Sequence, residues 1–455
     1  MLHSLVIGIH VAPIRTAVGT DTGVNADPCP CQNSSFSCSE EVIESFHSLF
    51  SRVLDPGSLC QQGCLGDVGY RYSHVTGGSK KIDRLLWQGG LWLDAVAASL
   101  PTTTTILNYT VMQGSPQIQT PGFAHYAVAW SPFHTNRIAL ASSANFGLVG
   151  NGRLHLVSAS PGPSGLPSLA VEKYYETQDG LYDVAWSEIH ENQLVTASGD
   201  GSIRLWDVMI NDLPIRAWQE HTREVFSVDW SNIKKDTFAS SSWDGTVKLW
   251  NPERPRSVST LQAHHSCVYQ ALFSPHQLDL LATCSTDGTM KIFDLRSPSY
   301  LTTGPNTNTF TNPITAPVLT VPASGTEILT LDWNKYRPMT LATAGVDKMT
   351  KVWDCRMIKL NDQPQVGGIC ETQLPGHEYA VRKVQWSPHR PDVLATASYD
   401  MTCRVWTTAP LQGRSQLLQI NDQHSEFVVG CAWSLYDEGV LASCGWDSRL
   451  NVFRP

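Results

Sequence analysis

Four histidines of the chain each precede an aspartate by 23 residues. The pairs are His221 with Asp244, His264 with Asp287, His377 with Asp400, and His424 with Asp447. A histidine beside a carboxylate can act as a general base, and both residue types are common metal ligands. A catalytic or metal site occurs once in a chain, however, whereas this spacing occurs four times. The repetition therefore favours a buried hydrogen-bond network within a repeated structural unit.

No other catalytic motif accompanies these pairs in the sequence. The chain contains no P-loop, no His-Glu-x-x-His, no Gly-x-Ser-x-Gly and no Cys-x-x-Cys. Its amino-terminal part carries several cysteines whose spacing matches no zinc module, namely Cys29, Cys31, Cys38, Cys60 and Cys64. We therefore predict a protein that is not an enzyme and that holds neither a metal nor another cofactor.

The composition excludes several further classes of protein. The 455 residues include 32 Lys and Arg against 41 Asp and Glu, a net charge of −9, whereas binding to nucleic acid requires a basic surplus. No stretch approaches the roughly 20 apolar residues that span a bilayer. The apolar run at residues 5–14 is short and lacks the flanks of a signal peptide. We interpret the 12 cysteines as the reduced thiols of a cytosolic protein.

A repeat with strict internal spacing fills the rest of the chain. In six copies an aromatic residue is followed by aspartate 14 positions later and by a second aromatic residue six positions after that. The first aromatic residues are Trp186, Trp230, Phe273, Trp333, Trp386 and Trp433. The aspartates are Asp200, Asp244, Asp287, Asp347, Asp400 and Asp447. A seventh copy around Trp130 has an insertion at residues 144–150 and Asn151-Gly152 in place of the aspartate turn.

Each copy has the pattern of a small antiparallel sheet. Apolar and polar residues alternate along its strands, and Asp-Gly pairs such as Asp200-Gly201 supply tight turns. A four-stranded sheet cannot bury its own faces, but several packed radially can. The copies resemble WD40 repeats, and this resemblance implies an all-β fold, a seven-bladed β-propeller.

The limits of the propeller follow from counting strands. The chain ends directly after the third strand of the seventh copy, so the last blade needs a strand from elsewhere. We expect residues 117–120 to supply it, within one propeller at residues 112–455. The first, second and fifth copies carry Pro121, Thr177 and Ser324 where the others have histidine. We expect packing, in place of the histidine–aspartate network, to hold these three blades together.

In WD40 propellers three positions of each repeat line one face around the axis. They lie six and four residues before the first aromatic residue and directly before the turn aspartate. Here these positions hold many aromatic residues, which are Tyr126, Tyr182, Phe226, Trp243, Tyr269, Tyr399, Phe427 and Trp446. Glu224 and Glu327 share the face, with Asp179 beside it, and Arg382 is the basic residue of the set. We expect solvent-facing aromatic residues that bind an apolar ligand with positive charge, about a third of them plugging the channel instead.

The resemblance extends to one family of WD40 proteins, the receptors for the type 2 peroxisomal targeting signal. It rests on residues 126–133, 179–187, 220–231, 242–250, 327–333, 376–388 and 445–447. It implies a receptor that binds the amino-terminal signal of cargo proteins in the cytosol and shuttles to the peroxisome matrix with a peroxin co-receptor. Membrane contact would occur only through the docking complex, and no nucleic acid would be bound.

The family's signal is a nonapeptide that forms an amphipathic helix with a basic and an apolar stripe. We assign Asp179, Glu224 and Glu327 to its basic end. We assign the apolar floor to Tyr182, Phe226, Trp243, Tyr269, Tyr399 and Trp446. The alternative function is that of a substrate adaptor or scaffold in a ubiquitin-ligase or chromatin complex, because a fold does not fix a function.

Residues 1–111 contain no copy of the repeat and have no counterpart in the receptor family. We expect this segment to be either a disordered extension or upstream sequence that the natural protein lacks. In the second case the natural protein would begin at Met112.

Overall fold

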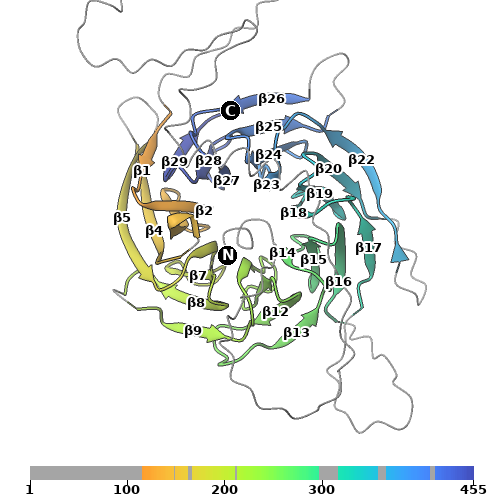
Figure 1. Cartoon of the computed structure of the whole chain (residues 1–455), viewed down its shortest axis with the longest axis horizontal. Coiled ribbons are helices and arrows are strands. Elements are labelled where there is room, and N and C mark those ends of the chain that lie inside the picture. Colours follow the sequence, from red (N-terminus) through yellow and green to blue (C-terminus); the bar gives the residue numbers. More distant parts are fainter. Residues whose placement is uncertain are drawn as a thin grey trace, which may run out of the picture. The chain divides into compact units, whose positions relative to one another are not determined.

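The computed structural model describes residues 115–147, 149–161, 167–210, 213–296, 316–356, 365–409 and 416–455. These residues form seven antiparallel sheets around a common axis, with one strand of each sheet beside the axis (Figure 1). The predicted all-β, seven-bladed propeller is therefore confirmed. The expectations for residues 1–111 concern a part of the chain outside the described residues.

Each blade runs from an inner strand beside the axis to an outer strand at the rim. The first blade contains β2 (Phe123–Trp130), β3 (Arg137–Ala144), β4 (Gly152–Pro161) and β5 (Pro167–Thr177), with the 3-10 turn η2 (Asn145–Gly147) after β3. The second contains β6 (Leu181–Trp186), β7 (Gln193–Ser198), β8 (Ser202–Asp207) and β9 (Arg216–Gln219). The third contains β10 (Val225–Trp230), β11 (Phe238–Ser242), β12 (Thr246–Trp250) and β13 (Ser259–Gln262).

The remaining blades follow the same order. The fourth contains β14 (Val268–Phe273), β15 (Leu280–Ser285), β16 (Thr289–Asp294) and β17 (Leu319–Pro322), and β21 (Gln365–Val366) adds a parallel edge to it. The fifth contains β18 (Ile328–Trp333), β19 (Thr340–Gly345), β20 (Thr350–Asp354) and β22 (Ile369–Leu374). The sixth contains β23 (Val381–Trp386), β24 (Val393–Ser398), β25 (Cys403–Thr407) and β26 (Leu417–Asn421). The seventh contains β27 (Val428–Trp433), β28 (Leu441–Gly445) and β29 (Arg449–Phe453).

The outer strand of the seventh blade comes from the other end of the propeller sequence. Strand β1 (Gln117–Gln119) pairs antiparallel with β29, with Ile118 opposite Leu450, and the two lie side by side in Figure 1. The N–H of Thr120 extends this pairing with a bond of 2.9 Å to the carbonyl of Ser448. This arrangement covers an edge that would otherwise offer unpaired backbone groups to another chain.

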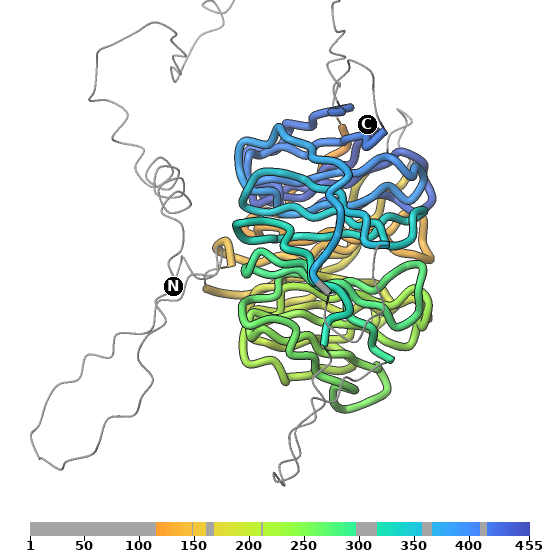
Figure 2. The backbone as a smooth tube through the Cα atoms, turned by 90° about the vertical axis from the view of Figure 1, so that its right-hand side faces the viewer, coloured from red at the N-terminus to blue at the C-terminus, as the bar shows by residue number. Residues whose placement is uncertain are grey.

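Neighbouring blades pack against one another through layers of buried side chains. Figure 2 shows the backbone of the propeller from the side. One such layer joins the first and second blades and includes Ala139, Leu154, Leu181, Trp186 and Leu194. The indole of Trp186 also donates to the carbonyl of Ala129 in the preceding blade, at 3.1 Å. Trp130 does the same to Ala432, at 3.1 Å, across the closure of the ring. Trp333 and Trp433 make the same kind of bond, so the first aromatic residue of the repeat joins its blade to the preceding one in four of the seven blades.

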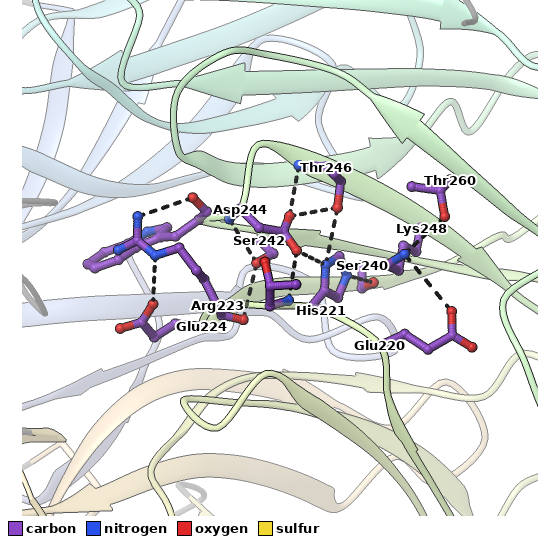
Figure 3. Close-up of polar contacts among 12 residues, drawn as sticks. Glu220, His221, Arg223, Glu224, Ser240, Ser242, Asp244, Thr246, Lys248 and Thr260 are labelled. Carbon is purple, nitrogen blue, oxygen red and sulfur yellow. Dashed lines mark hydrogen bonds and ion pairs between the residues drawn. The ribbon is translucent and has the colours of Figure 1, made fainter. Parts of the chain in front are cut away.

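Within the third blade, the histidine–aspartate pair belongs to a longer chain of hydrogen bonds (Figure 3). His221 Nδ1 lies 2.9 Å from Asp244 Oδ2, and His221 Nε2 lies 2.8 Å from the hydroxyl of Ser240. That hydroxyl in turn accepts the indole N–H of Trp250, at 2.8 Å. Burial alone would raise the pKa of Asp244, but the hydrogen bond and charge of His221 outweigh it and hold the pKa below its usual value.

Three other blades repeat this bonding. His264 with Asp287, His377 with Asp400, and His424 with Asp447 make the same contacts at 2.8, 2.7 and 3.1 Å. Each of these imidazoles also reaches a buried hydroxyl on the second strand of its blade, namely Thr283, Thr396 or Ser443. The aspartate turn, the preceding loop and the blade interior are thereby fixed to one another.

The other three blades contain no histidine–aspartate pair at these positions, but packing is not all that holds them, because each also has polar side-chain contacts. In the first blade His125 lies 2.8 Å from the hydroxyl of Ser142, and the same hydroxyl lies 3.1 Å from His155. In the second blade Asp200 accepts a bond of 2.7 Å from Arg204. These side chains do not occupy the repeat position where the other blades carry histidine. Inspection of that position alone therefore could not predict them.

The fifth blade replaces the histidine directly. The hydroxyl of Ser324 donates to Asp347 at 3.0 Å, and Lys351 reaches the same carboxylate at 2.7 Å. A short hydroxyl and a flexible ammonium together satisfy the carboxylate that an imidazole satisfies elsewhere.

Replacing His221 by alanine should destabilise the propeller by about 3 kcal/mol, because Asp244 and Ser240 both lose a buried partner. Thermal unfolding followed by circular dichroism measures this. The control is Thr222→Ala, since Thr222 is exposed and reaches Asp244 only through its backbone N–H, at 3.1 Å. Equal losses of stability in the two variants would contradict the role given to the network.

The first blade should make stability depend on pH. Burial lowers the pKa of His125 to about 4, so the folded chain resists a proton that the unfolded chain binds below about pH 6.5. The stabilisation is complete above that pH and is lost as the pH falls toward 4. The free energy of unfolding should therefore decrease between about pH 6.5 and about pH 4. In the variant His125→Gln the slope of this decrease should be smaller by up to about 1.4 kcal/mol per pH unit. Urea unfolding at several pH values tests this, with exposed His265→Gln as a control that should leave the slope unchanged.

Candidate functional site

The predicted face residues all lie at one end of the propeller. Tyr182, Phe226 and Tyr269 are each the second residue of an inner strand. Trp243 follows the second strand of its blade, and the pairing of Val225 with Ser242 brings it beside the start of β10. Because every blade repeats this antiparallel hairpin, the inner-strand starts and the aspartate turns meet on the same face.

The aromatic side chains of this face form one continuous cluster, which we term the aromatic layer. Its members are Tyr126, Tyr182, Phe226, Trp243, Tyr269, Tyr399, Phe427 and Trp446. Phe226 stacks on Trp243 with ring centroids 4.5 Å apart and on Tyr182 at 4.7 Å. Trp446 joins Phe427 at 5.3 Å and Tyr126 at 5.8 Å. The contacts link rings from six of the seven blades.

The expectation that these aromatic residues face solvent is wrong. Their exposed fractions range from 2% for Tyr182 to 8% for Tyr399. The cavity beneath them, lined also by Arg382 and Lys383, measures about 20 Å³, which is enough for one water molecule. The inner strands approach one another at the axis, so large rings meet there and close the channel. Four of the eight, Tyr126, Tyr182, Phe226 and Tyr269, line this cavity.

Several polar atoms of this face are buried without a hydrogen-bond partner among the described residues. They are the indole nitrogens of Trp243 and Trp446, the hydroxyl of Tyr269 and one carboxylate oxygen of Glu327. An unsatisfied buried polar group costs about 1–3 kcal/mol, so such groups seldom persist without a function. These atoms are covered by neighbouring side chains, so a ligand would reach them only if those side chains moved.

The three predicted carboxylates lie on the second, third and fifth blades. Burial raises the pKa of Glu327 to about 7. Burial also raises the pKa of Asp179, and the charges of Asp200 and Glu224 add to this. Glu224 lies 3.5 Å from Arg223, as Figure 3 shows. On the fourth blade between them, burial and the charges of Glu327 and Glu224 raise the pKa of Cys267, so these carboxylates flank one region.

Arg382 is a buried cation within the aromatic layer. Its guanidinium carbon lies 5.5 Å from the ring centre of Tyr269 and 5.7 Å from that of Phe226. It is 8% exposed, and no salt bridge to a carboxylate is found for it among the described residues. Aromatic faces therefore provide much of the environment of its charge.

An exposed aromatic residue of this face comes from the insertion in the first blade. Asn145, Phe146 and Gly147 all have left-handed backbone angles, with φ of 48°, 56° and 72°. The hydroxyl of Tyr126 donates to the carbonyl of Phe146 at 2.8 Å and holds this strained turn in place. The ring of Phe146 lies 5.6 Å from that of Trp446 and is 47% exposed. The sequence shows that the first blade has an insertion, but it does not show that the insertion packs against the aromatic layer.

Two further properties concern only the described residues. They contain no group of three or more His, Cys, Asp or Glu side chains placed to hold a metal ion. None of their helices is long and apolar enough to cross a membrane.

Comparison with known proteins gives a consistent set of relatives. The model of the WD domain, G-beta repeat family matches residues 171–207, 213–251, 255–294 and 368–407. The Peroxisomal targeting signal 2 receptor of Saccharomyces cerevisiae is 38% identical over 382 residues, which cover 73% of this chain and 97% of the relative. The human protein of the same name is 35% identical, with 74% and 94% covered. Peroxisome biogenesis protein 7 of Arabidopsis thaliana is 41% identical, with 73% and 95% covered.

Proposed function

Because the chain belongs to the family of peroxisomal targeting signal 2 receptors, we propose that its aromatic layer and the adjoining carboxylates bind the type 2 signal of peroxisomal matrix proteins. The observation that carries this proposal is the set of unpartnered polar atoms on that face. A helical signal with a basic and an apolar stripe has the complementary chemistry.

We assign the basic stripe to Asp179, Glu224 and Glu327. A lysine or arginine of the signal would satisfy the free oxygen of Glu327 and offset the cost of burying that carboxylate. The surrounding apolar surface would strengthen the interaction, because it lowers the local dielectric constant.

We assign the apolar stripe to the aromatic layer, represented by Tyr182, Phe226, Trp243, Tyr269, Tyr399 and Trp446. Since these rings are packed against one another, they offer their edges and indole N–H groups rather than open faces. Phe146 supplements them with a half-exposed ring beside Trp446. Leucine or another large apolar side chain of the signal would pack there.

The proposal extends to a co-receptor. A nine-residue helix is about 14 Å long and is marginally stable alone, and a single flat face covers only one of its sides. A peroxin that covers the other side would bury the remaining apolar surface and hold the cargo more tightly. We further propose that the complex reaches the membrane through the docking complex and that the receptor shuttles between the cytosol and the peroxisome matrix.

Reversing two charges on the face should abolish signal binding. In the variant Glu224→Arg with Glu327→Arg, the basic stripe meets two cations, and the affinity for a fluorescent type 2 signal peptide should fall at least 50-fold, or about 2.3 kcal/mol. Fluorescence anisotropy measures this loss. The control Glu253→Arg with Glu438→Arg makes the same change in net charge at exposed positions and should bind normally. Undiminished binding by the first variant would refute the assignment.

Signal binding should also strengthen as the pH rises. Because burial raises the pKa of Glu327 to about 7, this group is largely neutral at pH 6 and largely ionised at pH 8. The ionised form is the one that attracts a cation, so affinity should rise about tenfold over this range. The signal peptide used should contain no histidine, so that the peptide itself does not titrate over this range. Titration calorimetry of wild type and Glu327→Gln tests this, and an equal pH dependence in both would contradict it.

A further inference from the structure

The loops at the other end of the inner strands contain a position that repeats in every blade. It lies three residues after the first aromatic residue and holds Phe133, Ile189, Ile233, His276, Tyr336, His389 and Tyr436. In the fourth to seventh blades its side chain donates a hydrogen bond to a main-chain carbonyl of the next blade. These bonds run from His276 to Asn334 at 2.8 Å, from Tyr336 to Pro388 at 2.7 Å, from His389 to Ser434 at 3.0 Å, and from Tyr436 to Pro132.

The first three blades break this rule in succession. Phe133, Ile189 and Ile233 have no polar atom in their side chains and cannot form the bond, yet each is 40% to 47% exposed. The fold accommodates histidine or tyrosine at this position in four blades, so packing does not demand an apolar residue there. Exposing three large apolar side chains at one repeated position needs another reason.

A hollow of about 380 Å³ lies beside two of these residues. It is lined by Phe133 of the first blade and Ile189 of the second, together with the polar residues that follow Ile189. Two acidic residues, Glu191 and Asp207, line the hollow, and no lysine or arginine does. The hollow is therefore apolar on one side and acidic on the other.

Described residues on either side of positions 211–212 add more apolar surface, and hydrogen bonds hold the main chain of residues 208–210. Met209 and Leu213 are 71% and 72% exposed, and Ile210 is half-exposed. From the outer strand of the first blade, Lys173 donates to the carbonyl of Ile210 at 2.7 Å and Tyr175 donates to it at 2.8 Å.

The same main chain is joined to the hollow. The N–H of Val208 bonds to the carbonyl of Asn192, which belongs to the hollow's lining, at 2.8 Å. Together with the anchors from the first blade, this bond fixes the main chain of residues 208–210 beside the hollow. Little backbone entropy would be lost there on binding.

We propose that Phe133, Ile189, Met209, Ile210 and Leu213, with Glu191 and Asp207, form a second docking surface. Its occupant is a segment of a partner protein that places large apolar side chains next to a lysine or arginine. The exposed apolar residues favour such a segment over a free ion or small polar ligand, and the carboxylates in the hollow set its charge. An inner strand of six residues, about 20 Å long, separates this surface from the aromatic layer, so both can be occupied at once.

Selection of a phage-displayed library of random 16-residue peptides on the full chain tests the proposal. We expect enriched peptides that combine leucine, isoleucine or phenylalanine with lysine or arginine. Their affinity should fall at least tenfold in Ile189→Asp with Leu213→Asp. The matched control Leu278→Asp with Ile420→Asp alters two equally apolar positions elsewhere, 48% and 46% exposed, and should bind as wild type does.

A second variant tests the contribution of the acidic residues separately from that of the apolar surface. Glu191→Lys leaves the apolar surface intact and should also weaken these peptides several-fold. The double variant Ile189→Asp with Leu213→Asp should retain wild-type affinity for the type 2 signal peptide, which shows that it is folded and that the two surfaces are independent. Failure of signal binding in the wild type would therefore refute the proposed function without touching this inference.

Three results would overturn the inference. The first is that no enriched peptide is sensitive to the double variant, and the second is that the sensitive peptides are acidic. The third is a wild-type dimer that becomes a monomer in the double variant by light scattering, because the surface would then bind a second copy of the chain.

Discussion

The pairing of β1 with β29 joins residues more than 300 positions apart in the sequence and closes the ring of blades. Each blade has an apolar layer on both sides, and only a closed ring gives every blade two neighbours. Residues of the first and seventh blades, among them Trp130, Ile138, Ala432 and Leu450, share one such layer beside the closure. If this pairing were lost, the layer would be exposed, and the convergence of the inner strands at the axis would lose its constraint. The aromatic layer depends on that convergence.

The polar networks show how a repeated fold tolerates variation in sequence. Four blades satisfy the turn aspartate with a histidine, one with Ser324 and Lys351, and one with Arg204. The first blade has no such aspartate, and it fills its interior with His125, Ser142 and His155 instead. What is constant is that the turn aspartate has a side-chain partner in each of the six blades that carry it, because an unpaired buried carboxylate is costly. Unpartnered buried polar atoms occur in several blades, and those of Trp243, Trp446 and Glu327 are the ones beside the aromatic layer.

The two ends of the inner strands therefore differ in chemistry. At one end aromatic rings pack around the axis and leave two indole donors and one oxygen of Glu327 without partners, an arrangement that would complement an amphipathic ligand with positive charge. At the other end the blades differ at the position three residues after the first aromatic residue. In the fourth to seventh blades a histidine or tyrosine there forms a hydrogen bond to the next blade, whereas in the first to third blades an apolar side chain is partly exposed. Under the two proposals, one surface would hold the targeting signal and the other a separate partner protein.

The repeat spacing by itself determined the number of blades, the order of strands and the residues at the start of each inner strand. These features follow from local periodicity, because a strand alternates its side chains and a turn requires particular residues. The burial of Tyr182 and Trp446 did not follow, since it depends on rings from different blades that meet only when seven sheets surround one axis. The same holds for Phe146, whose turn is held by Tyr126 of the same blade and whose ring lies against Trp446 of the seventh blade. Sequence thus set which residues face the axis, and only the closed tertiary structure decided which of their atoms remain available to a partner.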